Sequence, residues 1–305
     1  MKNFVFILTV SFLFCSCGKE LDLNGNETFE PLAIMNCVMS VGEPIIVQFV
    51  QSKSPGDTGN FKIIEDAFIE INNSNIKYLD FILKKPKDDF NIGYYLCNDD
   101  LLESPKGETF TIKASNAKGS FSIVANTTVP GKPSIKNISL VDSKLFEYTG
   151  RKGTYNFNGI IEIEFETIEP NSFFQLEGNV VNDTYYNLFN VKKDSVYFSK
   201  CFLNFLKFEG ETFFDAFEVK ENTIRNNKLL VELSSIINYS KAIPDSINFE
   251  IRSITKNYFE YLQDLNKMEK SSQDPFGFPF IVRTNIENGY GIFAITNPYK
   301  INLKI

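Results

Sequence analysis

The sequence predicts a mainly β protein: an N-terminal antiparallel β-sandwich of the immunoglobulin-like kind, then a second β-rich domain. Three observations support this prediction. The 305 residues are enough for two hydrophobic cores. The 31 phenylalanines and 13 tyrosines, with no tryptophan, suit pleated and half-buried surfaces. Short alternating apolar runs recur between turn signals from Pro31 onward.

The first block, residues 31–130, contains roughly seven such runs, as expected for a small sandwich. Residues 32–39, 44–51 and 109–114 are typical examples. The block ends at the stretch "TTVPGKPSIKN", where prolines stand on both sides of Gly131. We therefore place the domain boundary there, with the second domain over residues 131–305.

The second domain is also predicted to consist of strands, except for one stretch over residues 255–270. Its apolar residues recur at helical spacing, at Tyr258, Tyr261, Leu262, Leu265 and Met268. Thr255 is placed to cap the N-terminus of such a helix. We predict one amphipathic helix here, with its aromatic face packed on the second sheet. Docking of a partner on that face is the alternative.

The N-terminus has the pattern of a secretory signal. Lys2 supplies a positive charge, and Phe4 to Phe14 form a short apolar stretch. As a helix this stretch spans roughly 16 Å, about half of the ~30 Å hydrocarbon core of a bilayer. It therefore fits a signal peptide and not a transmembrane anchor.

The signal ends on cysteine in the stretch "FCSCG", which resembles the lipobox of bacterial lipoproteins. Small Ser16 precedes Cys17, whereas bulky Phe14 precedes Cys15. We therefore predict cleavage after residue 16 and lipidation of Cys17, whose several acyl chains, including palmitate, give durable anchoring. Residues 17–30 then form a polar tether. A plain signal peptide that happens to contain cysteines is the alternative.

Of the 5 cysteines, Cys37, Cys97 and Cys201 belong to the body of the protein. Cys37 and Cys97 lie in the same predicted domain and could form a disulfide. Three buried thiols are the other interpretation. The sequence contains no CxxC motif, so neither a thioredoxin-like site nor a zinc ribbon is supported.

The composition excludes several classes of function. Histidine is absent, so there is no zincin motif and no Ser-His or Cys-His pair. A net charge of −7 and a pI near 5.0 argue against nucleic acid as a partner. We predict no enzymatic activity, no cofactor and no metal site.

Two acidic runs are candidate binding or catalytic sites. Asp99, Asp100 and Glu103 could bind calcium, but the run lacks the alternating oxygen ligands of a calcium loop. A solvated loop fits it better. A second run, Glu162, Glu164 and Glu166, alternates along one strand face. A solvent-exposed face of the sheet explains this alternation more simply than a pair of glycosidase carboxylates does.

The stretch "TNIENGYGIFAI" (284–295) predicts a terminal hairpin. Asn288-Gly289 is a tight-turn signal because both residues tolerate positive φ. Gly291, inside the returning strand, indicates a bulge or a close backbone approach. Ile286 and Phe293 are expected to anchor the hairpin in the core. A phosphate loop does not fit, because a strand and not a helix follows the glycines.

This end of the chain resembles the C-terminal signature of the domain of unknown function 4249 family of Bacteroidota lipoproteins. The resemblance consists of a Tyr-rich helix, an N-P-F-x-x-P-like segment and an N-I-x-N-G-x-G-x-F run. Asp274 stands where asparagine is frequent. The other matching positions are Pro275, Phe276, Pro279, Asn285, Ile286, Asn288, Gly289, Gly291 and Phe293.

The resemblance implies a lipid-anchored outer-membrane protein, facing either the cell surface or the periplasm. It also implies an accessory or cargo-binding role beside a TonB-dependent outer-membrane receptor, and no established enzymatic activity. Two alternatives stay open at this point. One is a structural or adhesive surface module, and the more remote one is a carboxylate-based glycan hydrolase.

Overall fold

The computed structural model describes residues 29–54, 57, 59, 61–85, 93–101, 104–147, 154–169, 171–181, 204–205, 212–213, 216–218, 227–238, 246–272 and 281–304. Leu32–Ser52 and Asn60–Ile305 form one compact unit, and Met1–Pro31 with Lys53–Gly59 form another. In the smaller unit, the Lys53 ammonium donates to the Gly59 carbonyl oxygen at 2.6 Å. The strands and the helix that the structure describes all belong to the larger unit.

The N-terminal block confirms the predicted sandwich. Its strands are β1 (Ala33–Ser40), β2 (Pro44–Gln51), β3 (Lys62–Ile63), β4 (Ala67–Asn72), β5 (Lys77–Tyr78), β6 (Phe81–Lys84), β7 (Tyr94–Asp100), β8 (Thr109–Asn116) and β9 (Ser122–Thr128). β1, β2, β3, β6 and β7 belong to one sheet, and β4, β5, β8 and β9 belong to the other. Alternate residues of both sheets point into a shared apolar core. In β1, for example, Met35 and Met39 are fully buried.

The apolar run over residues 76–83, one of the strand-like runs of the first block, does not form a single strand. It divides into β5, which pairs with β4, and β6, which pairs with β7. The chain therefore changes sheets at Leu79, and a strand that turns between two sheets cannot keep a strict alternation. Tyr78 is 3% exposed whereas Leu79 is 52% exposed.

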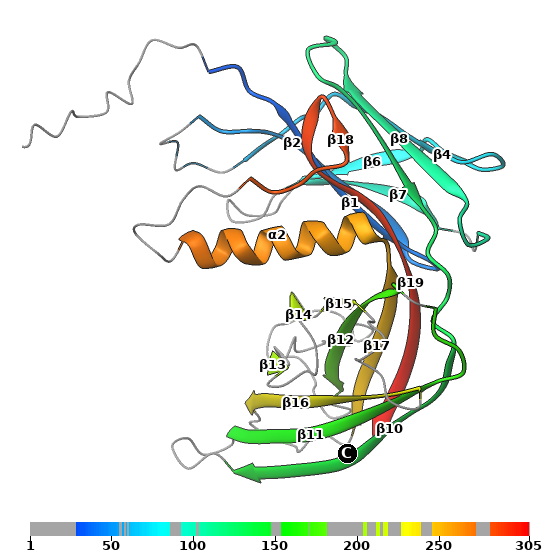
Figure 1. Cartoon of the computed structure of the whole chain (residues 1–305). Coiled ribbons are helices and arrows are strands. Elements are labelled where there is room, and N and C mark those ends of the chain that lie inside the picture. The colour runs from blue at the N-terminus through cyan, green and yellow to red at the C-terminus, as the bar shows by residue number, and fades with distance from the viewer. Residues whose placement is uncertain are drawn as a thin grey trace, which may run out of the picture. The chain divides into compact units, whose positions relative to one another are not determined.

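The last strand, β19 (Gly289–Lys304), is shared by both halves of the protein (Figure 1). Its first part pairs in parallel with β1, from Ala33 opposite Gly289 to Ser40 opposite Thr296. Its second part pairs antiparallel with β17 (Ser246–Ile254). A single 10-stranded sheet therefore runs across the boundary predicted near residue 131. The division into domains at that residue stays a prediction.

The second block adds one more sheet and extends the shared one. Its remaining strands are β10 (Ile135–Glu147), β11 (Thr154–Phe165), β12 (Phe173–Val181), β13 (Asn204–Phe205), β14 (Thr212–Phe213), β15 (Ala216–Glu218) and β16 (Lys228–Asn238). β10, β11, β16 and β13 form the additional sheet, while β12, β15 and β14 continue the shared sheet beyond β17. Phe165 of β11 packs on Phe174 of β12 with ring centroids 5.5 Å apart. This aromatic contact joins the two sheets.

One helix, α2 (Lys256–Ser272), lies near the predicted range. The Thr255 hydroxyl accepts a hydrogen bond from the Tyr258 amide at 3.4 Å, as expected of an N-cap. The buried side chains of the helix pack on Ile292 and Ala294, so it covers the shared strand. Met268, expected on the apolar face, is 42% exposed. In the part of the chain that the structure describes, no helix is long and apolar enough to cross a membrane.

Candidate functional site

The terminal hairpin is present, although its hydrogen bonding differs from the prediction. β18 (Ile286–Glu287) and β19 meet at Asn288, whose φ is 61°. Gly289 does not take a positive φ, so that part of the turn prediction is wrong. β18 forms its ladder with β9, where Ile286 lies opposite Ala125. The turn therefore closes the edge of the second sandwich sheet while β19 enters the first.

Asn285 holds the base of this turn with its side chain. Its Oδ1 accepts from the Phe293 amide at 2.9 Å, and its Nδ2 donates to the Phe293 carbonyl at 2.8 Å. Nδ2 also donates to the Asn126 carbonyl at 3.1 Å. The side-chain amide thus pairs with Phe293 as a neighbouring strand would, and it links β19 to β9.

The two glycines of the motif lie where β19 runs close to β1. A Cβ atom at Gly291 would stand 2.0 Å from the Met35 carbonyl oxygen, and one at Gly289 would stand 2.7 Å from the Ala33 carbonyl oxygen. Gly291 also has a φ of 107°, which favours glycine. Of the two possibilities at Gly291, the structure shows the close backbone approach. These glycines therefore serve strand pairing and do not cradle a ligand.

The residues that flank the glycines are buried. Ile286 is 5% exposed and Phe293 is fully buried, and both belong to the sandwich core. The other residues named from the sequence motifs, Pro275, Phe276 and Pro279, lie outside the described residues, as do the lipidation candidate Cys17 and Cys201.

An ion pair between a buried carboxylate and a half-exposed guanidinium ties the segment before the turn to α2. The Asp264 side chain is 3% exposed and accepts from the Arg283 Nε at 2.6 Å, from its Nη2 at 2.8 Å and from its backbone amide at 3.1 Å. Glu260 lies 3.1 Å from the Arg283 Nη1. The hydrogen bonds from Arg283 hold the pKa of the Asp264 carboxyl below its usual value. The arrangement is a structural clamp.

The three alternating glutamates predicted on one strand face are all paired with neighbouring side chains; Glu162 and Glu164 lie in β11, and Glu166 directly follows it. Glu164 accepts from the Lys136 ammonium at 2.7 Å, and Glu162 accepts from the Lys228 ammonium at 2.9 Å. Glu166 accepts from the Ser134 hydroxyl at 3.4 Å. The hydrogen bond from Lys136 lowers the pKa of Glu164. Carboxylates held in this way form a cross-strand charge ladder.

Cys37 and Cys97 are both buried and do not form a disulfide with each other. They lie on β1 and β7, and β2 runs between these strands. Two strands separated by a third lie roughly 10 Å apart, which exceeds the span of a disulfide. Burial raises the pKa of the Cys37 thiol, so this thiol is inert packing.

The acidic run near residue 100 is described only in part. Asp99 is exposed and Leu101 is buried, with its carbonyl accepting from the Gly42 amide at 2.9 Å. Glu103 lies outside the described residues. Among the described residues, no group of three or more acidic or cysteine side chains is arranged to hold a metal ion.

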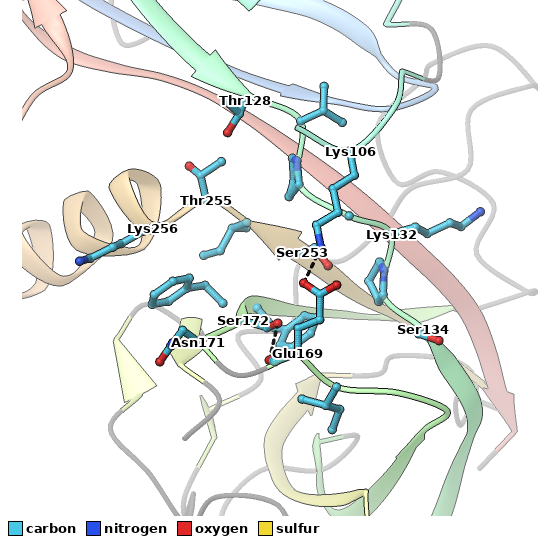
Figure 2. Close-up of a pocket in the computed structure, with 18 of the residues that line it drawn as sticks. Lys106, Thr128, Lys132, Ser134, Glu169, Asn171, Ser172, Ser253, Thr255 and Lys256 are labelled. Carbon is cyan, nitrogen blue, oxygen red and sulfur yellow. Dashed lines mark hydrogen bonds and ion pairs between the residues drawn. The ribbon is translucent and has the colours of Figure 1, made fainter. Parts of the chain in front are cut away.

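A polar groove of about 500 Å³ lies beside the N-terminus of α2 (Figure 2). Four segments line it: the turn at Lys106, residues 128–134, residues 167–174 without 170, and residues 253–256. The Lys106 ammonium forms an ion pair with Glu169 within it. The Ser172 hydroxyl donates to the Glu169 carbonyl at 2.8 Å, which fixes the loop that carries this carboxylate.

The sequence profile of a known family, described as Domain of unknown function (DUF4249), matches residues 19–302 of this chain. The chain belongs to the DUF4249 family. The match includes the terminal turn, so the family motif proposed from the sequence lies within the matched region. A search of curated proteins found no match.

Two solved structures are similar to the chain only distantly. The first, "Biofilm associated protein - BSP domain", has a TM-score of 0.16 and 8% identity over 88% of this chain and 58% of that one. The second, "Biofilm associated protein - B domain", has a TM-score of 0.15 and 8% identity over 88% of this chain and 85% of that one. The chain thus spans less than two thirds of the first. Scores this low say nothing about function.

Sequence reasoning missed both the groove and the Asp264–Arg283 clamp. Lys106 and Glu169 are 63 residues apart, so no local pattern joins them. Asp264 left a weak signal, because it is a charged residue beside the buried face of a predicted helix. An acidic residue next to Leu262 and Leu265, on the buried side of a helix, is expected to need a basic partner elsewhere in the chain.

Asp264→Asn should lower the free energy of unfolding at pH 7 by about 2 kcal/mol, because it removes the charge from the hydrogen bonds with Arg283. The pKa of Asp264 in the folded protein is below its ordinary 3.8. The stabilisation is therefore complete above that value and is lost as the pH falls through the folded pKa. Urea unfolding of both proteins over a pH series should show the gap between their stabilities narrow as the pH falls below 3.8.

The control is Glu65→Gln, which breaks an exposed ion pair with Lys85. It should change the unfolding free energy by less than about 1 kcal/mol at any pH in the series. A gap between wild type and Asp264→Asn that is as wide at acidic pH as at neutral pH would contradict the assignment of the clamp.

Proposed function

We propose that the protein is a lipid-anchored lipoprotein of the outer membrane that acts by binding a protein partner and not by catalysis. The observation that carries this proposal is Cys17, which follows a short apolar signal and small Ser16. A body tethered by acyl chains stays at the membrane surface, where its working partners are membrane proteins. A TonB-dependent receptor is the proposed partner, to which the protein contributes as an accessory or as a binder of its cargo.

The described side chains support binding over catalysis. The carboxylates of β11 are held in ion pairs, and the polar groups of the terminal turn satisfy the backbone of β19 and β9. Perturbed groups that converge on a cavity with a nucleophile or a base would favour an enzyme. The structural or adhesive module stays as the second candidate, which the partner experiment separates from the first.

Replacement of Cys17 tests the anchor. Wild-type protein expressed in its own cells should sediment with the membranes and carry acyl chains detectable by mass spectrometry. Cys17→Ser should lose both properties, whereas the matched control Cys15→Ser should keep both. Acyl chains on the Cys17→Ser protein would show that the lipidated residue is a different one.

The partner is tested by recovery from membranes extracted with a gentle detergent after mild crosslinking. An affinity-tagged wild-type protein should bring down an outer-membrane receptor in a stoichiometric amount. Recovery of the lipoprotein alone would contradict the proposed partnership. A deletion strain that takes up nutrients normally but no longer attaches to surfaces would favour the adhesive module.

A further inference from the structure

The shared sheet carries exposed apolar side chains at one end of its outer face. Leu32 is 44% exposed, Phe61 is 39% exposed and Tyr290 is 46% exposed. We call these three residues the end patch. Ile34 lies opposite Tyr290 in β19 and opposite Val50 in β2, so an apolar row crosses three strands beside Leu32. Apolar side chains that are exposed as a group, and not singly, are the usual mark of a contact surface.

The side chains of the end patch point away from the sandwich core. Gln51 lies opposite both Ala33 and Lys62, and Ala33 belongs to that core. Successive side chains of a strand point to opposite faces of the sheet. Leu32 and Phe61, which directly precede Ala33 and Lys62, therefore point to the outer face.

The helix α2 covers the next part of this face and leaves the end patch exposed. Ile292, Ala294 and Val38 pack in one apolar cluster with the buried side chains of α2. Tyr290 and Ile34 precede them at alternate positions of the same strands, so they share that face. The helix thus buries one stretch of the face, and the apolar surface continues beyond it.

The end patch lies where the N-terminal segment joins the body of the protein. Leu32 is the first residue of the larger compact unit, and β1 begins beside the beginning of β19 (Figure 1). Cys17 stands 15 positions before Leu32. A chain of this length spans about 50 Å when fully extended and about 20 Å as a flexible coil. A bilayer that holds an acylated Cys17 is therefore within reach of the patch.

The size of the patch favours a bilayer over a folded partner. Three large side chains with these exposed fractions present on the order of 250 Å². A stable protein complex buries about 800 Å² on each partner. A contact as small as the patch is weak by itself, but a tether keeps the bilayer at a high effective concentration. Tyrosine is also enriched at membrane–water interfaces, where the ring is buried and the hydroxyl stays hydrated.

We infer that the end patch rests in the headgroup region of the bilayer that holds Cys17, and that it turns this end of the sheet toward the membrane. The inference rests on the proposed lipid anchor. It adds an orientation to that anchor, because a tether alone holds the body near the bilayer without selecting a face.

Tryptophan fluorescence tests the contact, because the chain contains no tryptophan and an introduced one is the only reporter. Tyr290→Trp is compared with Phe68→Trp, whose position on β4 is 70% exposed and faces away from the core on the other sheet. The acylated full-length proteins are reconstituted into phosphatidylcholine vesicles with and without bromine on the acyl chains. Brominated lipid should quench the tryptophan of Tyr290→Trp and leave that of Phe68→Trp unquenched, although position 68 is the more exposed.

A second substitution in the Tyr290→Trp protein tests whether the patch acts as a unit. Leu32→Ser should weaken the contact about fivefold, as expected when one partly buried leucine is lost. The fold should be kept, because the Leu32 main chain stays bonded to the hydroxyl and the amide of Ser52, each at 2.8 Å. The matched control is Leu230→Ser, at a position of β16 that is 55% exposed, and it should leave the quenching unchanged.

Equal quenching of Tyr290→Trp and Phe68→Trp would overturn the inference. So would an emission shift of Tyr290→Trp that follows protein concentration and not lipid, which would assign the patch to a second copy of the chain. Acylated protein that sediments with the vesicles without this quenching would keep the anchor and refute the patch. Quenching of Tyr290→Trp by added vesicles in a Cys17→Ser background, with no acyl chains on the wild-type protein, would refute the anchor and keep the patch.

Discussion

The parallel pairing of β19 with β1 is the constraint on which the rest of the structure depends. The two strands come from opposite ends of the chain, and Ala33 lies opposite Gly289. β19 then continues past β1 to pair with β17. Without it, the sandwich would lack part of its first sheet, and the second block would lack its connection to that sheet. One strand thus makes a single sheet out of two blocks.

The pairing explains why polar residues precede this strand and why a glycine lies within it. Gly291 lets the backbone approach Met35, and the side chain of Asn285 satisfies the main chain of Phe293 on the other side. Arg283, just before, is held by Asp264 of α2. The helix itself covers β19 through Ile292 and Ala294. Each of these interactions fixes the position of β19.

A sheet of this kind has consequences for folding. Phe293 and Ile295 of β19 are fully buried in the sandwich core, although most of that core comes from residues before 130. The contacts between β1 and β19 close a loop of more than 250 residues, as the pair Ala33–Gly289 shows. Contacts of such long range form late and slow folding. The sandwich is therefore complete only when the whole chain is available.

Local patterns predicted much of this fold. Alternation identified β1 and β2, helical spacing identified α2, and the glycine inside a strand at 291 indicated a close approach. What they could not supply is the identity of the neighbouring strand. Period-two alternation shows that a segment is a strand, but its partner and its direction depend on contacts distant in sequence. The hairpin signal at Asn288-Gly289 therefore located the turn but not the pairing of β18 with β9.

The same limit applies to the groove and to the clamp. Lys106 and Glu169 meet only because two loops from different blocks come together, and Arg283 meets Asp264 only because the chain returns along α2. Charged residues in loops are ordinarily solvated, so Lys106, Glu169 and Arg283 do not stand out in the sequence. The acidic runs that did stand out, at residues 98–103 and in β11, do not form a metal site among the described residues.

The central claim is tested most directly by Gly291→Ala compared with Gly119→Ala. Both positions have a positive φ, but a Cβ atom at Gly119 has nothing within 4 Å, whereas one at Gly291 meets the Met35 carbonyl at 2.0 Å. Alanine at 119 should cost about 1 kcal/mol of backbone strain, and alanine at 291 more than about 3 kcal/mol. Hydrogen exchange in Gly291→Ala should show β1, β2, β12 and β17 losing protection together. Stability equal to that of Gly119→Ala, or full protection of β1 and β2 while β12 and β17 open, would contradict the account.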